Sequence, residues 1–281
     1  MRLRNFVLLG VGTLVAAACE DDDGVSSVTR GPKAFVRFVN ATVDTGAVDF
    51  RFVDKVENLP TFLGVPFRGT SGGYQGVDPG TRPVRVFAND TTVAGTAARL
   101  IDTTITLAAD ARYTLVYAGR ARGNADRLAI IEEDAALPAP AAGQIAVKTI
   151  HAAVGTGPVD VFVGNSGGNP ITATVTKFSN VAYLAKTTYA TIATRPTGAG
   201  NLYTFAVANA GTTTAAFSAT PNMPGAAAPA GQTYGAQPGV QVSGSVLTAI
   251  VFPGATAGSR AATSTNQTPS VILVFDKSLD P

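Results

Sequence analysis

The sequence has little of the residues from which most metal and catalytic sites are built. Among 281 residues there are one histidine, one cysteine, two methionines and no tryptophan. Zinc and copper sites take most of their ligands from histidine and cysteine, so these counts argue against such a site. The lack of tryptophan weakens the case for an aromatic platform that binds sugars. We expect no metal and no cofactor.

Charge is scarce as well. Asp, Glu, Lys and Arg make up 14% of the chain, against about 25% in an average soluble protein. Arg2 and Arg4 lie in a segment that we expect to be removed, and without them 19 basic residues balance 19 acidic ones. A neutral chain gives no electrostatic case for binding nucleic acid. Ala, Gly, Thr and Val replace the helix-favouring residues and suit short strands and tight turns, so the composition predicts an all-β protein.

One apolar run stands out, at the N-terminus. The residues from Phe6 to Ala18 are mostly apolar, follow a basic start and end at Cys19. This 13-residue run is too short for a membrane-spanning helix, which needs about 20 residues, and no other stretch comes close. A basic start, a short apolar run and small residues at its end predict a secretory signal peptide over residues 1–18.

The only cysteine follows directly. Leu14-Val-Ala-Ala-Ala-Cys19 resembles the lipobox of bacterial lipoproteins, whose cysteine thiol receives diacylglycerol before cleavage. Ala16 stands where the commonest motif has leucine, and the same alanines would suit an ordinary signal peptidase. A single cysteine in an exported chain has no disulfide to explain it, so we expect lipid attachment at Cys19. A chance cysteine behind a plain signal peptide is the alternative.

A polar segment, residues 19–33, comes next. It contains the acidic run Glu20-Asp-Asp-Asp-Gly24, which lacks the spaced ligands and distal glutamate of a calcium loop. Like charges in a row repel one another and stay solvated, so we expect a flexible tether.

Internal repetition is the most informative feature of the remaining chain. Residues 36–52 (VRFVNATVDTGAVDFRF) and 147–163 (VKTIHAAVGTGPVDVFV) match at seven of 17 positions with an offset of 111. Chance would give about one match, so we infer a duplication. The alignment places Asn40 on His151 and Asp49 on Asp160.

Both copies show short alternating segments separated by Gly, Pro and Asn turns. The strands expected in copy one are residues 35–41, 48–53, 83–88, 101–107, 112–117 and 128–131, and in copy two residues 145–152, 159–163, 171–178, 188–193, 202–208, 212–217, 246–252 and 271–275. This spacing predicts two tandem immunoglobulin-like β-sandwich domains, with closed barrels as the alternative.

The predicted domains are repeat 1 over residues 34–136 and repeat 2 over residues 145–281. A Pro- and Ala-rich linker, residues 137–144, joins them. The later strands align with an offset of 134, so repeat 2 carries an insertion, placed at the Pro-, Gly- and Ala-rich residues 220–239.

The opening of each copy resembles the domain-of-unknown-function family 4397. Its pattern is a strand ending in His-Ala, a short turn and Val-Asp-Val-aromatic-Val, found here from Ile150 to Val163. The segment from Asn40 to Phe52 is a weaker version with asparagine in place of histidine, and Gly244 to Val251 resembles the family's penultimate strand. The resemblance implies an exported bacterial envelope protein, often with tandem domains, and no established activity.

Two segments match the hydrolase pattern G-x-S-x-G, at Ser71 and Ser166. A nucleophile elbow needs a strand before the serine and a helix after it, and neither segment predicts both. His151, Asp160 and Ser166 follow the order of a serine-protease triad but lie too close in sequence for that fold. Because Asn40 aligns with His151, we expect a hydrogen-bonding role for this histidine and no catalytic residue.

The other polar groups have structural interpretations. Asp49 and Asp160 are expected to cap neighbouring turns, with a shared ligand contact as the alternative. The charge run Glu132-Glu-Asp134 is expected on a solvated face. The tyrosines of the middle and second half are expected to pack in the core or in loops: Tyr74, Tyr183, Tyr189, Tyr203 and Tyr234.

These observations favour a non-enzymatic structural or interaction module. We expect it to be exported and lipid-anchored in the bacterial cell envelope, in the outer membrane, with the side of the membrane left open. Its expected partners are the membrane, through the lipid on Cys19, and an unknown protein or glycan. The alternative is a surface lipoprotein that binds a ligand or carbohydrate, and an enzyme with paired carboxylates is a distant third.

Overall fold

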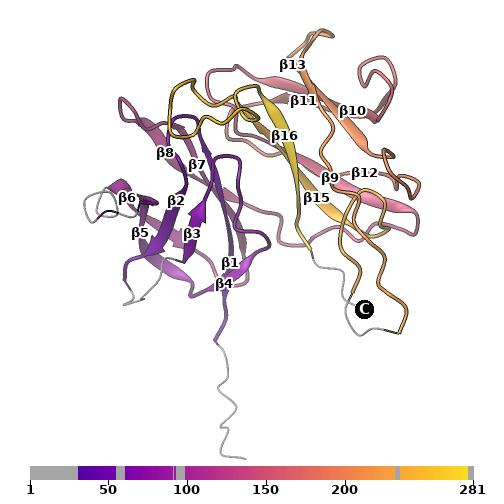
Figure 1. The fold of residues 1–281 in the computed structure, drawn as a ribbon. Helices are drawn as coiled ribbons and strands as arrows, with labels where there is room; N and C mark the ends of the chain where they lie inside the picture. Colours follow the sequence, from indigo (N-terminus) through magenta and orange to yellow (C-terminus); the bar gives the residue numbers. More distant parts are fainter. Residues whose placement is uncertain (1–30, 55–60, 91, 93–98, 232–234, 278–281) are drawn as a thin grey trace, which may run out of the picture. The chain divides into compact units, whose positions relative to one another are not determined.

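Sixteen β-strands make up the described part of the fold (Figure 1). The computed structural model describes residues 31–54, 61–90, 92, 99–231 and 235–277, and within these ranges no residue is helical. The predicted all-β class is therefore confirmed.

Repeat 1 contains eight strands in two sheets. They are β1 (Ala34–Thr42), β2 (Val48–Phe52), β3 (Phe62–Val65), β4 (Gln75–Val77), β5 (Gly80–Ala88), β6 (Arg99–Leu107), β7 (Arg112–Arg120) and β8 (Ala125–Glu132). The sheet β4-β1-β7-β8 is called the inner sheet below, and β3-β2-β5-β6 the outer sheet. Only β1 and β7 pair in parallel, and the other pairs are antiparallel.

Repeat 2 follows the same plan. Its strands are β9 (Gln144–His151), β10 (Val159–Asn165), β11 (Thr174–Val181), β12 (Ala190–Ala193), β13 (Tyr203–Asn209), β14 (Ala215–Ala219), β15 (Val246–Phe252) and β16 (Ser270–Phe275). Its inner sheet is β12-β9-β15-β16 and its outer sheet β11-β10-β13-β14. Every strand occupies the place of its counterpart in repeat 1, and the two sandwiches confirm the predicted fold.

The strand register agrees with the sequence alignment. Val36 of β1 lies opposite Tyr113 of β7, and Val147 of β9 lies opposite Leu247 of β15. These pairs are related by the offsets of 111 and 134 found in the sequence. A one-residue slip would turn every side chain to the other face of the sheet, so this agreement shows that the two repeats have the same strand register.

Three differences from the sequence prediction concern edges and loops. The short edge strands β3 and β4 were not expected, because glycine and proline interrupt their patterns. Strands β11 and β14 begin at Thr174 and Ala215, each three residues later than in the expected ranges 171–178 and 212–217. Repeat 2 also has a second long connection, residues 253–269 between β15 and β16, where repeat 1 has only the tight turn of residues 121–124. Of the predicted insertion, the described part contains a bridge between Ala226 and Gln237.

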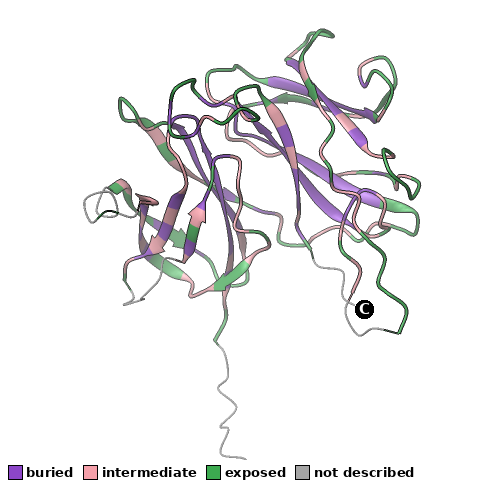
Figure 2. Cartoon of the chain, viewed as in Figure 1, coloured by how far each residue is buried: buried purple, intermediate pink, exposed green. Residues whose placement is uncertain are grey.

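Each sandwich encloses its own apolar core. In repeat 1 the ring of Phe38 lies 5.1 Å from that of Phe50 and 6.1 Å from that of Phe62, joining the two sheets. In repeat 2 the core is built mainly of valines, with Phe178 and Phe205. The central strands of the inner sheets, β1, β7, β9 and β15, are buried on both faces, as Figure 2 shows in purple.

The second buried face of the inner sheets is an interface between the two repeats. Ten buried residues form one cluster there, and they are five pairs of equivalent positions: Val39 and Ile150, Ala41 and Ala152, Val116 and Ile250, Ala118 and Phe252, and Ile131 and Val274. The same surface of both repeats therefore meets itself, which is the arrangement of a two-fold symmetric dimer. Residues 32–281 accordingly form one compact unit.

The two ends of this unit are distinct. Residue 32 precedes β1, and the carboxyl ends of β1, β7, β9 and β15 lie at the opposite end, which is called the distal end below. There Thr256 N–H and the hydroxyl of Ser259 both donate to Val43 O, so loop 253–269 of repeat 2 packs on repeat 1. None of the described segments is a helix with the length and hydropathy of a membrane span.

Candidate functional site

A cluster of buried charges lies in the interface between the repeats. Arg37 of β1 donates to the carboxylate of Asp276, which follows β16, at 2.8 Å. Lys148 of β9 forms an ion pair with Glu133, which follows β8. Arg37 and Lys148 occupy equivalent positions in the two repeats. Each repeat therefore provides a cation at the same position for a carboxylate of the other repeat.

Hydroxyl groups complete the coordination of both carboxylates. Thr114 of β7 donates to Glu133 at 2.5 Å, and its counterpart Thr248 of β15 donates to Asp276 at 2.6 Å. The hydroxyl of Tyr189 also donates to Asp276, at 3.0 Å. Both carboxylates are thus paired and hydrogen-bonded, as buried charges need to be.

Two tyrosines cover the cations of the cluster. The Arg37 guanidinium lies 4.6 Å from the ring centroid of Tyr74, and Lys148 Nζ lies 4.7 Å from that of Tyr189. Burial raises the pKa of Tyr74 and Tyr189, so both remain neutral hydrogen-bonding groups. Burial is the largest influence on Arg37 and would lower its pKa, but the charge and hydrogen bond of Asp276 together with Tyr74 and Glu133 raise that pKa overall.

This cluster corrects one expectation from the sequence. Glu133 was expected on a solvated face, but it is 5% exposed and central to the interface. Its neighbour Glu132 is exposed, as expected. Alternation along β8 indicates only which face a residue lies on, and here that face is covered by the other repeat. The signal in the sequence for a buried charge cluster was the equivalent pair Arg37 and Lys148, because both basic residues lie within apolar strands of a weakly charged protein.

The equivalent residues Asn40 and His151 make the same contacts at the ends of β1 and β9. Asn40 Nδ2 donates to Gly46 O at 3.2 Å, and its Oδ1 accepts from Thr42 N–H at 3.1 Å. His151 Nε2 lies 3.1 Å from Gly157 O, and its Nδ1 accepts from Ala153 N–H at 3.3 Å.

Both ring nitrogens of His151 therefore make hydrogen bonds to the backbone of the turn between β9 and β10. An acceptor at Nδ1 places the proton on Nε2, which faces the Gly157 carbonyl and the Thr156 hydroxyl at 3.2 Å. The ring is fully buried, and burial lowers the pKa of His151 more than the Gly157 carbonyl raises it. Neutral His151 acts as an ordering group at a strand end, the role that Asn40 has in repeat 1.

Asp49 and Asp160 stabilise equivalent irregularities in the outer sheets. Asp49 accepts from Gly64 N–H at 2.7 Å, and Asp160 accepts from Asn180 N–H at 2.8 Å. Both donors have left-handed backbones, with φ of 61° and 51°, and lie beside register shifts in their strand pairs. The carboxylates thus satisfy amides that a β-bulge removes from the ladder.

Asp160 has two further partners, Gly211 N–H at 3.0 Å and Lys177 Nζ at 2.8 Å. Burial would raise the pKa of Asp160, but the bond to Lys177 and the two backbone amides together lower it. The carboxylate therefore stays ionised in the folded protein.

The two serines of the hydrolase pattern make structural hydrogen bonds. Ser71 Oγ accepts from Phe38 N–H of β1 at 3.0 Å. Ser166 Oγ donates to Gly200 O and accepts from Leu202 N–H at 3.1 Å. Ser166 lies directly after the last residue of β10. His151 is held by the turn that lies before the first residue of β10, at the other end of the same strand. Seven strand residues at about 3.3 Å each separate them by about 20 Å, so His151, Asp160 and Ser166 do not form a triad.

The remaining tyrosines also pack internally. The ring of Tyr183 stacks edge-on to His151 at 5.9 Å, and the hydroxyl of Tyr203 donates to Ala193 O at 2.6 Å. Tyr234 lies outside the described residues. So do the signal peptide over residues 1–18, Cys19 and the acidic run Glu20–Gly24.

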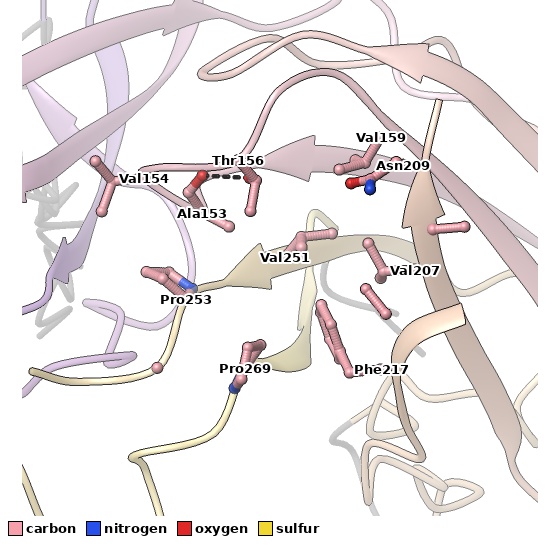
Figure 3. Close-up of a pocket in the computed structure, with 13 residues that line it drawn as sticks. Ala153, Val154, Thr156, Val159, Val207, Asn209, Phe217, Val251, Pro253 and Pro269 are labelled. Atoms are coloured by element: carbon pink, nitrogen blue, oxygen red, sulfur yellow. Dashed lines mark hydrogen bonds between the residues drawn. The ribbon is translucent and has the colours of Figure 1, made fainter. Parts of the chain in front are cut away.

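A cavity of about 260 Å³ opens at the distal end of repeat 2 (Figure 3). Its lining is mostly apolar and comes from the turn between β9 and β10, the start of β10, the ends of β13 and β15, β14 and the long loop: Ala153, Val154, Thr156, Val159, Val207, Ala208, Asn209, Ala216, Phe217, Val251, Pro253, Gly254 and Pro269. Thr156 links it to the His151 turn, because its hydroxyl donates to Ala153 O at 2.8 Å. No group of three or more His, Cys, Asp or Glu side chains among the described residues is arranged to hold a metal ion.

Comparison with known proteins identifies one family. Residues 34–162 match the model of a family described as "Domain of unknown function (DUF4397)", which confirms the resemblance seen in the sequence. The match covers repeat 1, the linker and the first strands of repeat 2. No curated protein matches the chain.

A solved structure described as a "putative cell adhesion protein" from Bacteroides uniformis has 11% sequence identity and a TM-score of 0.21. The alignment covers 87% of this chain and 99% of that one. Agreement at this level carries no argument about the function of this chain.

Proposed function

Since residues 34–162 carry a domain of the DUF4397 family, we propose that this chain is a lipid-anchored protein of the bacterial cell envelope. In this proposal it is exported, cut before Cys19 and held in the outer membrane by diacylglycerol on that cysteine. It serves as a non-enzymatic structural or interaction module, with a protein or glycan of the envelope as its partner.

The observation that carries the non-enzymatic proposal is the use of both ring nitrogens of His151. A general base needs one nitrogen free to take a proton from a nucleophile. Here Nδ1 accepts from Ala153 N–H and Nε2 faces Gly157 O, and the repeat-1 counterpart Asn40 makes the same contacts. A residue whose place asparagine can take is an ordering group rather than a base.

The interface between repeats supports a module that acts as one body. Its apolar cluster is continuous with the paired charges of Arg37, Glu133, Lys148 and Asp276. Residue 32, next to the proposed tether, lies at one end of this body. Strands β1 and β9, at about 3.3 Å per residue, place the distal end about 25–30 Å away. The distal end is therefore the surface that we propose for a partner.

Anchoring is tested with Cys19→Ser in cells fed a fatty acid that can be labelled. We expect the wild type to carry the label and to sediment with membranes, and the variant to lose both properties. Ser27→Ala, in the same polar segment, is the matched control and should behave as the wild type. The lipid anchor is refuted if the variant still sediments with membranes and its mass differs from the wild type only by the exchange of sulfur for oxygen. The chain would then carry a plain signal peptide.

The second candidate function is ligand binding at the cell surface. The cavity at the distal end of repeat 2 is the observation that favours it, since apolar pockets with a few polar groups are the usual form of ligand sites.

A further inference from the structure

The cavity of repeat 2 has the size of a small chemical group rather than of a large ligand. Its volume of about 260 Å³ lies below the roughly 300–1,000 Å³ of most ligand pockets. It exceeds the ~150 Å³ of an engineered apolar cavity that holds benzene in another protein. One aromatic ring or a branched alkyl group, with a small substituent, fits this space.

The walls of the cavity select for an apolar group. Val207, Val251 and Phe217 belong to or pack on the core of repeat 2, and none of the thirteen lining residues is charged. Figure 3 shows Val154 and Pro253 at one end of the cavity and Phe217 with Val207 at the other. An apolar group in this position gains roughly 25 cal/mol for each Å² removed from water.

One polar side chain of the lining is available to a ligand. Thr156 already donates to Ala153 O, but the amide of Asn209 takes part in none of the hydrogen bonds formed among the described residues. Asn209 ends β13 and is exposed, so its side-chain amide can contact a polar substituent at the Val207 end of the cavity.

A cation of repeat 1 approaches the other end of the cavity, next to Val154. Arg120 ends β7, and its Nη2 lies 4.0 Å from the point that a Cβ on Gly155 would occupy. Gly155 stands between Val154 and Thr156, which both line the cavity. The Arg120 side chain is exposed, and no carboxylate pairs with it among the ion pairs of the described residues. An unpaired guanidinium beside an apolar cavity favours a ligand that joins an apolar group to an anion.

We propose that the distal cavity of repeat 2 binds a small carboxylate whose apolar part is one aromatic ring or a branched alkyl group. The apolar part fills the cavity between β14 and β15, and the carboxylate lies at the Val154 end of the cavity, beside Arg120. The long loop 253–269, which repeat 1 lacks, supplies one wall through Pro253, Gly254 and Pro269. This inference rests on the second candidate function and is independent of the membrane anchor.

Three probes separate the two parts of the proposed ligand. Phenylacetate has both the ring and the charge, phenylacetamide has only the ring, and acetate has only the charge. Binding is measured by ligand-observed NMR and isothermal titration on the full chain carrying Cys19→Ser, without detergent, because detergent would compete for an apolar cavity. We expect saturable binding of phenylacetate, about fivefold weaker binding of phenylacetamide, as for loss of a partly exposed ion pair, and none of acetate.

Variants locate the site. Ala216→Leu places a larger side chain at the cavity from an exposed position, so it should abolish binding without unfolding the protein, as checked by circular dichroism. Ser218→Leu, on the same strand but outside the lining, is the matched control and should bind normally. Arg120→Gln should reduce phenylacetate binding to the level of phenylacetamide and leave phenylacetamide unchanged.

Several results would overturn the proposal. One is the absence of saturable phenylacetate binding up to about 10 mM, the concentration at which a site with a binding free energy of roughly 3 kcal/mol would be half filled. Another is equal phenylacetate binding by Ala216→Leu and the parent protein. Equal affinities for phenylacetate and phenylacetamide would remove the role of Arg120. All binding is measured on the Cys19→Ser chain, so these experiments test the cavity independently of the anchor. If the anchoring proposal fails, the affinities should not change.

Discussion

Removing one cation from the buried charge cluster should destabilise the protein by several kcal/mol, and by an amount that depends on which cation is removed. Lys148→Met keeps much of the length and apolar volume of the lysine but removes its charge. Arg37→Met does the same at the equivalent position in repeat 1. A broken buried ion pair generally costs about 3–5 kcal/mol, because the remaining charge is left buried.

The contacts of each carboxylate decide where in that range each variant falls. Without Lys148, Glu133 still has Arg37 Nη2 at 3.7 Å and Lys186 Nζ at 3.8 Å. Asp276 has no second cationic partner among the ion pairs of the described residues and would keep only hydroxyl donors. We therefore expect Lys148→Met to lower the free energy of unfolding by about 3 kcal/mol and Arg37→Met by about 5 kcal/mol.

The measurement is urea unfolding followed by far-ultraviolet circular dichroism, on the chain carrying Cys19→Ser. A second substitution that neutralises the stranded carboxylate, Glu133→Gln with Lys148→Met, should recover at least about 2 kcal/mol. The control is Lys177→Met, whose side chain is 37% exposed in its ion pair with Asp160, and it should cost less than about 1 kcal/mol.

The reasoning fails if Lys148→Met costs no more than Lys177→Met, or if Arg37→Met costs less than Lys148→Met. It also fails if the double variant is as unstable as the sum of its single variants, since that would show that Glu133 and Lys148 do not interact.

Two further predictions concern the polar groups inside repeat 2. His151→Asn should cost less than about 1 kcal/mol and His151→Ala about 1–2 kcal/mol in urea unfolding, because asparagine already makes these hydrogen bonds in repeat 1, and a serine-reactive phosphonate should not label Ser166. Because burial lowers the pKa of His151, its contribution to stability is complete above the unfolded pKa of about 6.5 and is lost as pH falls through the folded pKa, so His151→Asn should show a flatter stability profile between pH 7 and about 5. Labelling of Ser166 that disappears with His151→Ala would contradict the non-enzymatic proposal. Asp160→Ala should cost about 1–3 kcal/mol because it leaves the amides of Asn180 and Gly211 without acceptors, and an unchanged urea midpoint would contradict this.

The sequence was enough to predict most of the local structure. The alternation of apolar residues gave the class and most strands, and the offset of 111 gave the equivalence of Asn40 with His151. Short strands such as β3 were missed because Gly64 and Pro66 interrupt the pattern that identifies a strand.

The candidate site was only partly predictable. The order of His151, Asp160 and Ser166 in the chain indicated nothing about their distance, because β10 separates two of them. The cavity could not be found from sequence either. Its lining comes from segments between Ala153 and Pro269, and most of these residues are common apolar ones that would read as core in any sandwich.

What the sequence determined by itself was the repeated unit, because strand period and turn chemistry act over a few residues and are written in neighbouring positions. What only the tertiary structure decided was how the two units meet. Alternation assigns Arg37 and Glu133 to the face of a sheet that points away from its own core, and that face is solvated unless another sheet covers it. The partner of Arg37 is Asp276, 239 residues away, and no local pattern links them. The charges are buried because two copies of one surface pack against each other, a property of the folded chain rather than of any segment in it.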